Sequence, residues 1–379
     1  MTAPRVLFYV QHLLGIGHLV RASRVADALK AAGCEVAVIS GGVPVQGFPG
    51  SDIESIEIPA IRAADEAFSK LVDGSGEVVD EVLWNTRLER LLSLVEKHRP
   101  DILIIEAFPF GRRQMRKEIL SFIEAARRLK PRPLVVSSIR DILQENRKPG
   151  RADETIDTLN SLFDHVLVHG DANFARLEET FPRAGELTCG VSYTGLVAGS
   201  EPDQPAERFA VLVSAGGGAA GGRLIEAALG AARQLANAQS PWCIITGPNF
   251  VHDGGVPGHV KLERFRPDLP SLLAGAGVSI SQAGYNTVCD ILRARCRSIL
   301  VPFAAGGETE QSLRAGKLAR LKLAQVVPES SLDAGKLIAA IAAATGQDAS
   351  VSHGLDLEGA RHSAEIVLRL AALRRGQSA

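Results

Sequence analysis

Short runs of β-branched and other apolar residues alternate along the chain with longer stretches in which apolar residues recur at helical spacing. In the first half, five apolar runs predict strands, at 6–10, 35–40, 102–106, 134–138 and 165–169. Four stretches between them predict helices, at 19–32, 82–98, 113–130 and 153–162. Strands that alternate with helices are typical of a parallel sheet covered by helices.

A second series of the same kind follows residues 195–206, a stretch with Pro and Gly that we interpret as a linker. Its predicted strands lie at 209–214, 242–246, 278–281 and 298–302, and its predicted helices at 222–238, 285–295 and 310–320. Each half opens with a strand that runs into a Gly-rich turn, at 13–23 and 214–224.

This organisation predicts an α/β protein with two doubly wound, Rossmann-like domains facing each other across a cleft, at 1–197 and 206–354. The segment 355–379 has apolar residues at helical spacing and no strand after it. We expect a helix there that either closes the second domain or crosses back to the first.

Composition narrows the class of protein. The chain has 379 residues, of which 46% are hydrophobic and 22% charged, as in globular proteins. The chain has 42 basic and 43 acidic residues, so its net charge does not favour binding to nucleic acid. Five scattered cysteines predict neither a disulfide framework nor a zinc site, and favour a reducing cytoplasm. No segment is typical of a membrane helix, although peripheral contact with the inner face of a membrane stays open.

The first Gly-rich turn is Gly15-Ile16-Gly17-His18. Val20 stands where a dinucleotide fingerprint has its third glycine, and the next strand ends without the expected acidic residue, so the pattern disfavours NAD. The turn would instead bring backbone N–H groups and His18 to a helix N-terminus in the cleft. His18 has the chemistry of a general base, since its ordinary pKa lies near neutral pH. The alternative is a packing turn with a solvent-exposed histidine.

The second turn, Ser214 to Arg223, has five glycines after an apolar strand and no P-loop lysine. Exposed backbone N–H groups at a helix N-terminus suit a diphosphate, so the turn, which includes Gly216, Gly217 and Gly218, is interpreted as a phosphate-binding loop. The alternative is a merely flexible loop.

The densest group of polar candidates lies at 280–324. Gly284 would break the strand, Asn286 and Thr287 suit the cap of the next helix, and Asp290 could accept both hydroxyls of a ribose.

A further turn follows Pro302, with Gly306 and Gly307. After it, Glu308, Glu310 and Gln311 stand near a helix start, where they could bind sugar hydroxyls. The alternative is that the glutamates only complement the helix dipole.

A basic run in the first domain consists of Arg112, Arg113, Arg116 and Lys117. These cations could bind an anionic acceptor or a membrane surface. The alternative is a solvated face balanced by Glu118 and Glu124.

The order strand, QAGYNTVCD, strand, VPF, GGETEQ, helix resembles the donor site of GT-B glycosyltransferases, especially the family 28 branch that contains the N-acetylglucosaminyltransferase of peptidoglycan synthesis. The two Gly-rich turns lie where that family has its other glycine loops. The resemblance implies that Asp290 holds the ribose, Glu310 and Gln311 the donor sugar, the turn at 216–218 the diphosphate, and that His18 faces the reaction centre. Gln282, Gly284, Asn286 and Thr287 belong to the same donor motif, and Gly15, Gly17, Arg112 and Arg113 to the acceptor side. Gln282 and Asp290 depart from the residues usual in the family.

The resemblance implies transfer of a sugar from a nucleotide-diphosphate sugar, a UDP-sugar in the first place, to an acceptor hydroxyl with inversion. Because the sequence has no D-x-D pair, we expect no metal. We expect no cofactor either. The acceptor stays unidentified, with lipid-linked compounds and glycans as candidates. Three alternatives stay open: a nucleotide-sugar hydrolase or 2-epimerase, a non-catalytic nucleotide-sugar-binding protein, and a nicotinamide oxidoreductase.

Overall fold

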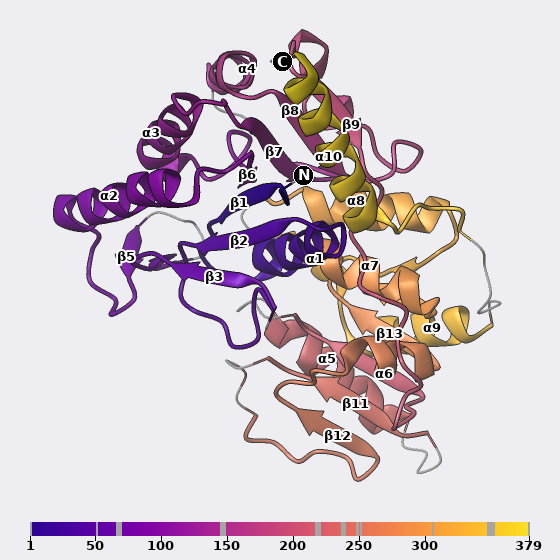
Figure 1. Ribbon diagram of the computed structural model, residues 1–379. Helices are drawn as coiled ribbons and strands as arrows, with labels where there is room; N and C mark the ends of the chain where they lie inside the picture. The colour runs from indigo at the N-terminus through magenta and orange to yellow at the C-terminus, as the bar shows by residue number, and fades with distance from the viewer. Residues whose placement is uncertain are drawn as a thin grey trace. The chain divides into compact units, whose positions relative to one another are not determined.

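The computed structural model describes residues 2–50, 52–65, 70–144, 149–216, 221–235, 240–247, 250, 252–304, 307–346 and 353–377. The chain divides into two compact units. Unit 1 comprises Met1–Val197 and Leu355–Ala379, and unit 2 comprises Ala198–Gly354. The chain therefore returns to unit 1 at its C-terminal end, which Figure 1 shows in yellow.

Unit 1 is built on a parallel sheet, which among the described residues has seven strands in the order β3-β2-β1-β6-β7-β8-β9. These strands are β1 (Arg5–Val10), β2 (Glu35–Ser40), β3 (Glu54–Glu57), β6 (Ile102–Glu106), β7 (Leu134–Arg140), β8 (His165–His169) and β9 (Gly190–Tyr193). A separate antiparallel pair joins β4 (Ile61–Ala63) to β5 (Leu71–Asp73). The helices of unit 1 are α1 (Gly17–Ala31), α2 (Glu81–His98), α3 (Arg116–Arg127), α4 (Arg151–Leu162) and α10 (Gly359–Gln377), with short 3₁₀ turns η1 (Arg113–Met115), η2 (Leu177–Glu179) and η3 (Ala184–Glu186).

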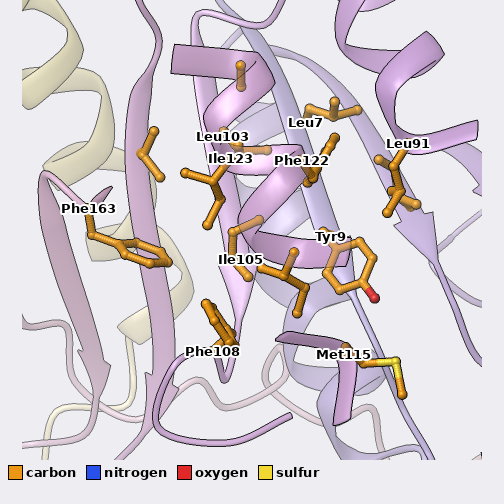
Figure 2. Packing of buried hydrophobic residues seen from close by; sticks show 14 of the residues in the cluster. Leu7, Tyr9, Leu91, Leu103, Ile105, Phe108, Met115, Phe122, Ile123 and Phe163 are labelled. Atoms are coloured by element: carbon orange, nitrogen blue, oxygen red, sulfur yellow. The ribbon is translucent and has the colours of Figure 1, made fainter. Parts of the chain in front are cut away.

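A hydrophobic core of unit 1 lies between one face of its sheet and α2, α3 and α4. Alternate residues of a strand point to the same face, so Leu7 and Tyr9 of β1 enter this core together. Figure 2 shows Tyr9, Ile105 and Phe122 within it. On the other side, α1 contacts β1 and β2, and α10 packs against α1 and contacts β7. The sheet is therefore covered by helices on both faces.

Unit 2 has a parallel sheet with six strands among the described residues, in the order β12-β11-β10-β13-β14-β15. These strands are β10 (Val211–Ser214), β11 (Trp242–Ile245), β12 (Val260–Glu263), β13 (Val278–Ser281), β14 (Ser298–Leu300) and β15 (Gln325–Val326). The helices are α5 (Gly222–Gln234), α6 (Leu269–Gly275), α7 (Tyr285–Ala294), α8 (Glu310–Arg320) and α9 (Ala334–Thr345), with the 3₁₀ turn η6 (Glu329–Ser331). Helices α5 and α9 pack together over one face of the sheet, with Leu229 and Leu337 in its core.

The predicted fold class is confirmed, because each unit is a doubly wound α/β sheet, and all nine predicted strands are present. The strands that the apolar pattern missed include β3, β9, β12 and β15, which form the outer edges of the two sheets. An edge strand is only partly buried, so polar sequences such as ESIE and VKLE are compatible with it. The predicted helix at 113–130 begins with the 3₁₀ turn η1. Helix α5 ends at Gln234, and the last residues of the helix predicted at 222–238 lie outside the described residues.

In both sheets, the chain winds outward in two directions from the first strand, β1 or β10. Ligands of such sheets bind at the carboxyl ends of the strands where the winding reverses. In unit 1 these are the ends of β1 and β6, and in unit 2 those of β10 and β13. None of the described helices is long and apolar enough to cross a membrane.

Candidate functional site

His18 lies in the first turn of α1, directly after the loop that follows β1. Helix α1 begins at Gly17, and its N-cap residue Ile16 makes no side-chain cap hydrogen bond. The imidazole is 19% exposed, and its Nδ1 lies 3.0 Å from Oε1 of Glu106. His18 is thus partly buried and held by a carboxylate, so the alternative of a solvent-exposed histidine is wrong.

Glu106 is the last residue of β6, the strand beside β1, and it is fully buried. Its Oε1 forms an ion pair with the buried Arg21 of α1, one helical turn beyond His18. Its Oε2 accepts a hydrogen bond of 2.6 Å from the hydroxyl of Ser138 in β7. A buried carboxylate requires partners of this kind, since an unpaired charge in the interior is very costly.

These partners determine which nitrogen of His18 carries the proton. An ionised carboxylate only accepts hydrogen bonds, so the contact of 3.0 Å with Glu106 requires the proton on Nδ1. Arg21 Nη2 also lies 3.3 Å from Nδ1, but an arginine only donates, and Nδ1 cannot accept while it donates to Glu106. In neutral His18, Nε2 is therefore the proton acceptor.

The electrostatics favour neutral His18 and ionised Glu106. Burial, together with the positive charge of Arg112, lowers the pKa of His18 to about 3. For Glu106, burial raises the pKa, but the charge of Arg21 and the hydrogen bonds from His18 and Ser138 outweigh it and bring the pKa to about 2. At neutral pH the pair is thus an imidazole base oriented by a carboxylate.

Arg112 belongs to the same region of unit 1. Its backbone is left-handed, with φ of 59°, and its Nε donates a hydrogen bond of 2.6 Å to the carbonyl of Gln11, just after β1. Burial and the nearby charge of Arg140 lower the pKa of Arg112 to about 10, so the guanidinium stays charged at neutral pH. Gly15 and Gly17, the other acceptor-side candidates, lie in the loop and at the start of α1.

The other residues of the basic run at 112–117 were interpreted either as an anion-binding or membrane-binding surface or as a solvated face, and the structure shows a different arrangement. Arg113 and Arg116 both form ion pairs with Glu154 of α4, while Lys117 is exposed. Glu118, which was expected to balance the run, is instead buried and paired with Arg87 of α2 at 2.6 Å. The expectation that Glu118 serves a solvated face is therefore wrong.

In unit 2, predicted donor residues meet at the carboxyl ends of β10 and β13. Gly216 follows β10 with φ of +75°, a conformation that L side chains rarely adopt. A Cβ built on Gly216 would lie 3.4 Å from Oε1 of Gln282, which follows β13. Gly247, after β11, has φ of +78°, and its Cβ would lie 3.0 Å from the carbonyl of Gly216. Three loop segments thus approach closely here, with little room for side chains. Gly217, Gly218 and Gly306 lie outside the described residues.

Helix α8 holds the loop after β13 through both groups of the Ala283 backbone. Oε1 of Gln311 accepts hydrogen bonds from the N–H of Ala283 at 3.0 Å and of Phe303 at 3.1 Å. Arg314 donates to the carbonyl of Ala283 at 3.0 Å and to Glu310 at 2.8 Å. Glu310 and Arg314 are both buried. The structure thus shows that Glu310 and Gln311 organise this loop, and their contact with a sugar stays a prediction.

The first turn of α7 differs in detail from the sequence interpretation. The N-cap residue is Gly284, with φ of −64° and no side-chain cap hydrogen bond, so Asn286 and Thr287 lie inside the helix and do not cap it. The expectation of a cap at these residues is wrong by about half a turn. Asp290 lies in the second turn of α7 and is partly buried. Glu308 precedes α8, whose first residue is Glu310.

Sequence reasoning missed Glu106, Arg21, Ser138 and Arg314 as members of these sites. A signal existed for Glu106, because it is the one charged residue of the run ILIIE and stands at the carboxyl end of that strand. Arg21 and Arg314 also follow the helical spacing, three residues after His18 and four after Glu310. Nothing local singled out Ser138.

Residues 211–352 match the family described as the glycosyltransferase family 28 C-terminal domain. This range covers most of unit 2. One relative is UDP-N-acetylglucosamine--N-acetylmuramyl-(pentapeptide) pyrophosphoryl-undecaprenol N-acetylglucosamine transferase of Lachnospira eligens. The chain is 28% identical to it over 88 residues, and these residues make up 23% of this chain and 25% of the relative. The chain thus matches about a quarter of the relative's length.

Solved structures show the same fold over nearly the whole chain. The calicheamicin glycosyltransferase CalG4 is similar with a TM-score of 0.63 and 15% identity, covering 99% of this chain and 98% of that one. MurG of Acinetobacter baumannii is similar with a TM-score of 0.55 and 17% identity, covering 98% and 99%. The chain therefore has the GT-B fold of glycosyltransferases.

Proposed function

We propose that this protein is an inverting, metal-independent glycosyltransferase that moves a sugar from a UDP-sugar to a hydroxyl group of an acceptor. One observation carries the proposal: the imidazole of His18 is hydrogen-bonded through Nδ1 to a buried carboxylate at the ligand-binding edge of unit 1. The family 28 domain in unit 2 supports the class of donor.

In this proposal, His18 is the general base. Its Nε2 takes the proton of the acceptor hydroxyl while that oxygen forms a bond to C1 of the donor sugar. The bond between C1 and the diphosphate oxygen breaks in the same step, and the nucleoside diphosphate leaves with the electron pair. Glu106 stabilises the imidazolium that forms and keeps the proton on Nδ1 before the reaction. A single displacement of this kind inverts C1.

The donor would bind to unit 2 at the loops after β10 and β13. Gly216, Gly217 and Gly218 would approach the diphosphate, and the N-terminal ends of α5 and α7 would stabilise its negative charge. Asp290 would accept hydrogen bonds from the ribose hydroxyls. The name of the matched relative, which contains UDP-N-acetylglucosamine, supports uridine as the base.

The acceptor would bind to unit 1, beside Gly15, Gly17 and Arg112. Arg112 keeps its charge at neutral pH, so it could hold an anionic group of an acceptor. The relative's name contains a pyrophosphoryl-undecaprenol acceptor, and this supports lipid-linked diphosphates as the first acceptors to test, before glycans.

The experiment is a panel of UDP-, dTDP- and GDP-sugars, measured first by thermal stabilisation and then by release of the nucleoside diphosphate. We expect UDP-sugars to stabilise the protein most, and UDP release to depend on an added acceptor. Release without an acceptor would indicate a hydrolase, epimer formation a 2-epimerase, and binding without turnover a sensor. Each of these outcomes would overturn the transferase proposal.

Replacing the proposed base gives a second test. His18→Ala should lower kcat by roughly 10²–10⁴-fold, with the affinity for UDP nearly unchanged. Glu106→Gln should also lower kcat, because the amide offers His18 Nδ1 a weaker acceptor. Turnover by His18→Ala equal to that of the parent protein would remove His18 from the mechanism.

A further inference from the structure

A continuous line of buried polar side chains extends from Glu106 into the interior of unit 1. The hydroxyl of Ser138 lies 2.6 Å from Glu106 Oε2 and 2.9 Å from Nε2 of His169. His169, the last residue of β8, contacts the hydroxyl of Thr194 through Nδ1 at 3.0 Å. Ser138 is 1% exposed and His169 is fully buried.

The direction of each hydrogen bond follows from the charge of Glu106. The ionised carboxylate only accepts, so the single proton of the Ser138 hydroxyl points to Glu106. The oxygen of Ser138 must then accept a hydrogen bond from Nε2–H of His169, so neutral His169 carries its proton on Nε2 and not on Nδ1. Burial lowers the pKa of His169 to about 3, so this neutral form is the one present at neutral pH. The protons of the Ser138 hydroxyl and of His169 Nε2 are thus both oriented toward Glu106.

The C-terminal helix reaches this line as well. Ser363 of α10 is fully buried, and its hydroxyl lies 3.4 Å from Nδ1 of His169. The contact joins β8 to a helix that lies almost 200 residues further along the chain. Glu106 is thus held from two directions: Arg21 of α1 binds one oxygen, and Ser138, supported by His169, binds the other.

We propose that Ser138 and His169 are positioning residues, which orient the Glu106 carboxylate so that it fixes the proton of His18 on Nδ1. The proposal rests on the proposed function insofar as His18 is the base. Neither residue touches the reacting atoms, so their contribution passes entirely through Glu106. Loss of the Ser138 hydroxyl leaves Oε2 without this donor and lets the carboxylate rotate away from the imidazole.

The chain offers a matched control for this position. Ser137 is the neighbour of Ser138 in β7, is equally buried, and makes one hydrogen bond of 2.7 Å to the carbonyl of Phe108. Because successive residues of a strand point to opposite faces, its hydroxyl lies on the other side of the sheet. Ser137→Ala therefore loses one buried hydroxyl bond and leaves Glu106 untouched.

The first measurement is kinetic. We expect Ser138→Ala to lower kcat about tenfold, the effect of losing one hydrogen bond of ordinary net strength, with KM for the donor unchanged. Ser137→Ala should stay within about twofold of the parent protein. In the His18→Ala background, Ser138→Ala should have no further effect, because residues that act through one another are not additive. Equal effects of the two serine variants, or full additivity with His18→Ala, would overturn the proposal.

The second measurement does not depend on turnover. The Nδ1–H proton of His18 should give a downfield NMR signal, assigned by its disappearance in His18→Gln. We expect Ser138→Ala and His169→Ala to shift this signal and Ser137→Ala to leave it in place. An unshifted signal in Ser138→Ala would overturn the positioning role, whereas a shifted signal in a protein without sugar transfer would overturn the proposed function alone. If Ser138→Ala does not fold, Ser138→Cys fills the site with a weaker donor and serves the same test.

Discussion

His18 and His169 have different partners in unit 1 but share one property: burial lowers the pKa of each to about 3. For a proposed base, this means that the imidazole accepts a proton in the reaction only if a neighbouring group stabilises the positive charge of the imidazolium. Glu106 is such a group for His18, because its ionised carboxylate lies 3.0 Å from the imidazole. Burial thus lowers the pKa of His18, whereas Glu106 orients the ring and opposes this shift.

The lowered pKa of His18 predicts the pH dependence of turnover. A histidine with the ordinary pKa of about 6.5 would be only about 3% unprotonated at pH 5, and kcat/KM would fall accordingly. With a pKa of about 3, His18 stays neutral, so we expect kcat/KM to be nearly constant from pH 8 to pH 5. The pH profile of initial rates checks this, and an acid limb near pH 6.5 that disappears in His18→Ala would contradict it.

Stability should respond to pH in a different way. The folded-state pKa of His169 lies below the unfolded value of about 6.5, so the unfolded chain binds the proton first as the pH falls. The stability from neutral His169 is therefore present above pH 6.5 and is lost as the pH falls toward 3. Between pH 7 and pH 5 this loss is about 2 kcal/mol. Urea unfolding at both pH values should show a smaller loss for His169→Gln, and an equal loss would contradict the assignment.

Asp290 allows a test of the donor site with a single side chain. If its carboxylate binds the ribose, Asp290→Ala should weaken UDP binding by about 1.5–3 kcal/mol, the size of hydrogen bonds to a charged group. The same substitution should matter much less for dideoxyuridine diphosphate, which lacks both hydroxyls. Titration calorimetry with the two ligands measures the difference, and equal losses would show that Asp290 acts only on the helix.

Helices α2 and α3 are joined by a buried ion pair that the amphipathic pattern did not indicate. Arg87 of α2 is fully buried and binds both carboxylate oxygens of Glu118, at 2.9 Å through Nε and at 2.6 Å through Nη2. Its guanidinium also donates to the side chain of Gln11 at 2.9 Å, and Glu118 accepts from Tyr9 at 2.7 Å. This network connects the packing of two helices to the loop that carries Arg112, through Gln11.

Removing Arg87 should therefore be strongly destabilising. Arg87→Ala leaves the carboxylate of Glu118 buried without its cation, and the expected cost is about 3–5 kcal/mol. Arg90→Ala is the control, because Arg90 is an exposed arginine of the same helix. The free energy of unfolding of unit 1, measured in urea, compares the two. A cost below 1 kcal/mol for Arg87→Ala would mean that the pair does not hold α2 against α3.

The path of the chain makes unit 1 discontinuous in sequence. Residues Leu355–Ala379 complete it after unit 2 has been built, and α10 packs against α1. Val367 of α10 is fully buried, and near the end of the helix Arg374 binds Asp164 at 2.6 Å. Unit 1 thus includes a helix that follows unit 2 in the sequence.

Deletion of residues 355–379 should consequently destabilise unit 1 and spare unit 2. The loss of buried apolar side chains of α10 alone should cost more than about 3 kcal/mol. The chain's two tryptophans report the units separately, since Trp84 lies in α2 and Trp242 in β11. We expect the Trp84 fluorescence transition to move to lower urea and the Trp242 transition to stay, each followed in a variant that lacks the other tryptophan. Movement of the Trp242 transition alone would contradict this dependence.

The inner strands of both sheets were predictable because strands covered by helices on both faces need nearly continuous apolar runs, such as ILIIE and HVLVH. Residue type and local turn chemistry also pointed to His18, because a histidine after Gly17 at a strand-to-helix turn is visible in a few consecutive residues. The edge strands β3 and β12 gave a weaker signal, since partial burial permits polar residues.

The partners of these residues could not be found in this way. Glu106 stands 88 positions from His18, and Ser138 another 32 from Glu106, yet parallel pairing of β1, β6 and β7 brings all three together. In the same way, the N-cap of α7 is Gly284 and not Asn286 as predicted. Glu118, predicted to lie on the surface, forms a buried ion pair with Arg87. Local patterns describe what each segment can bury, whereas strand order and helix packing decide which distant side chains share the same buried space.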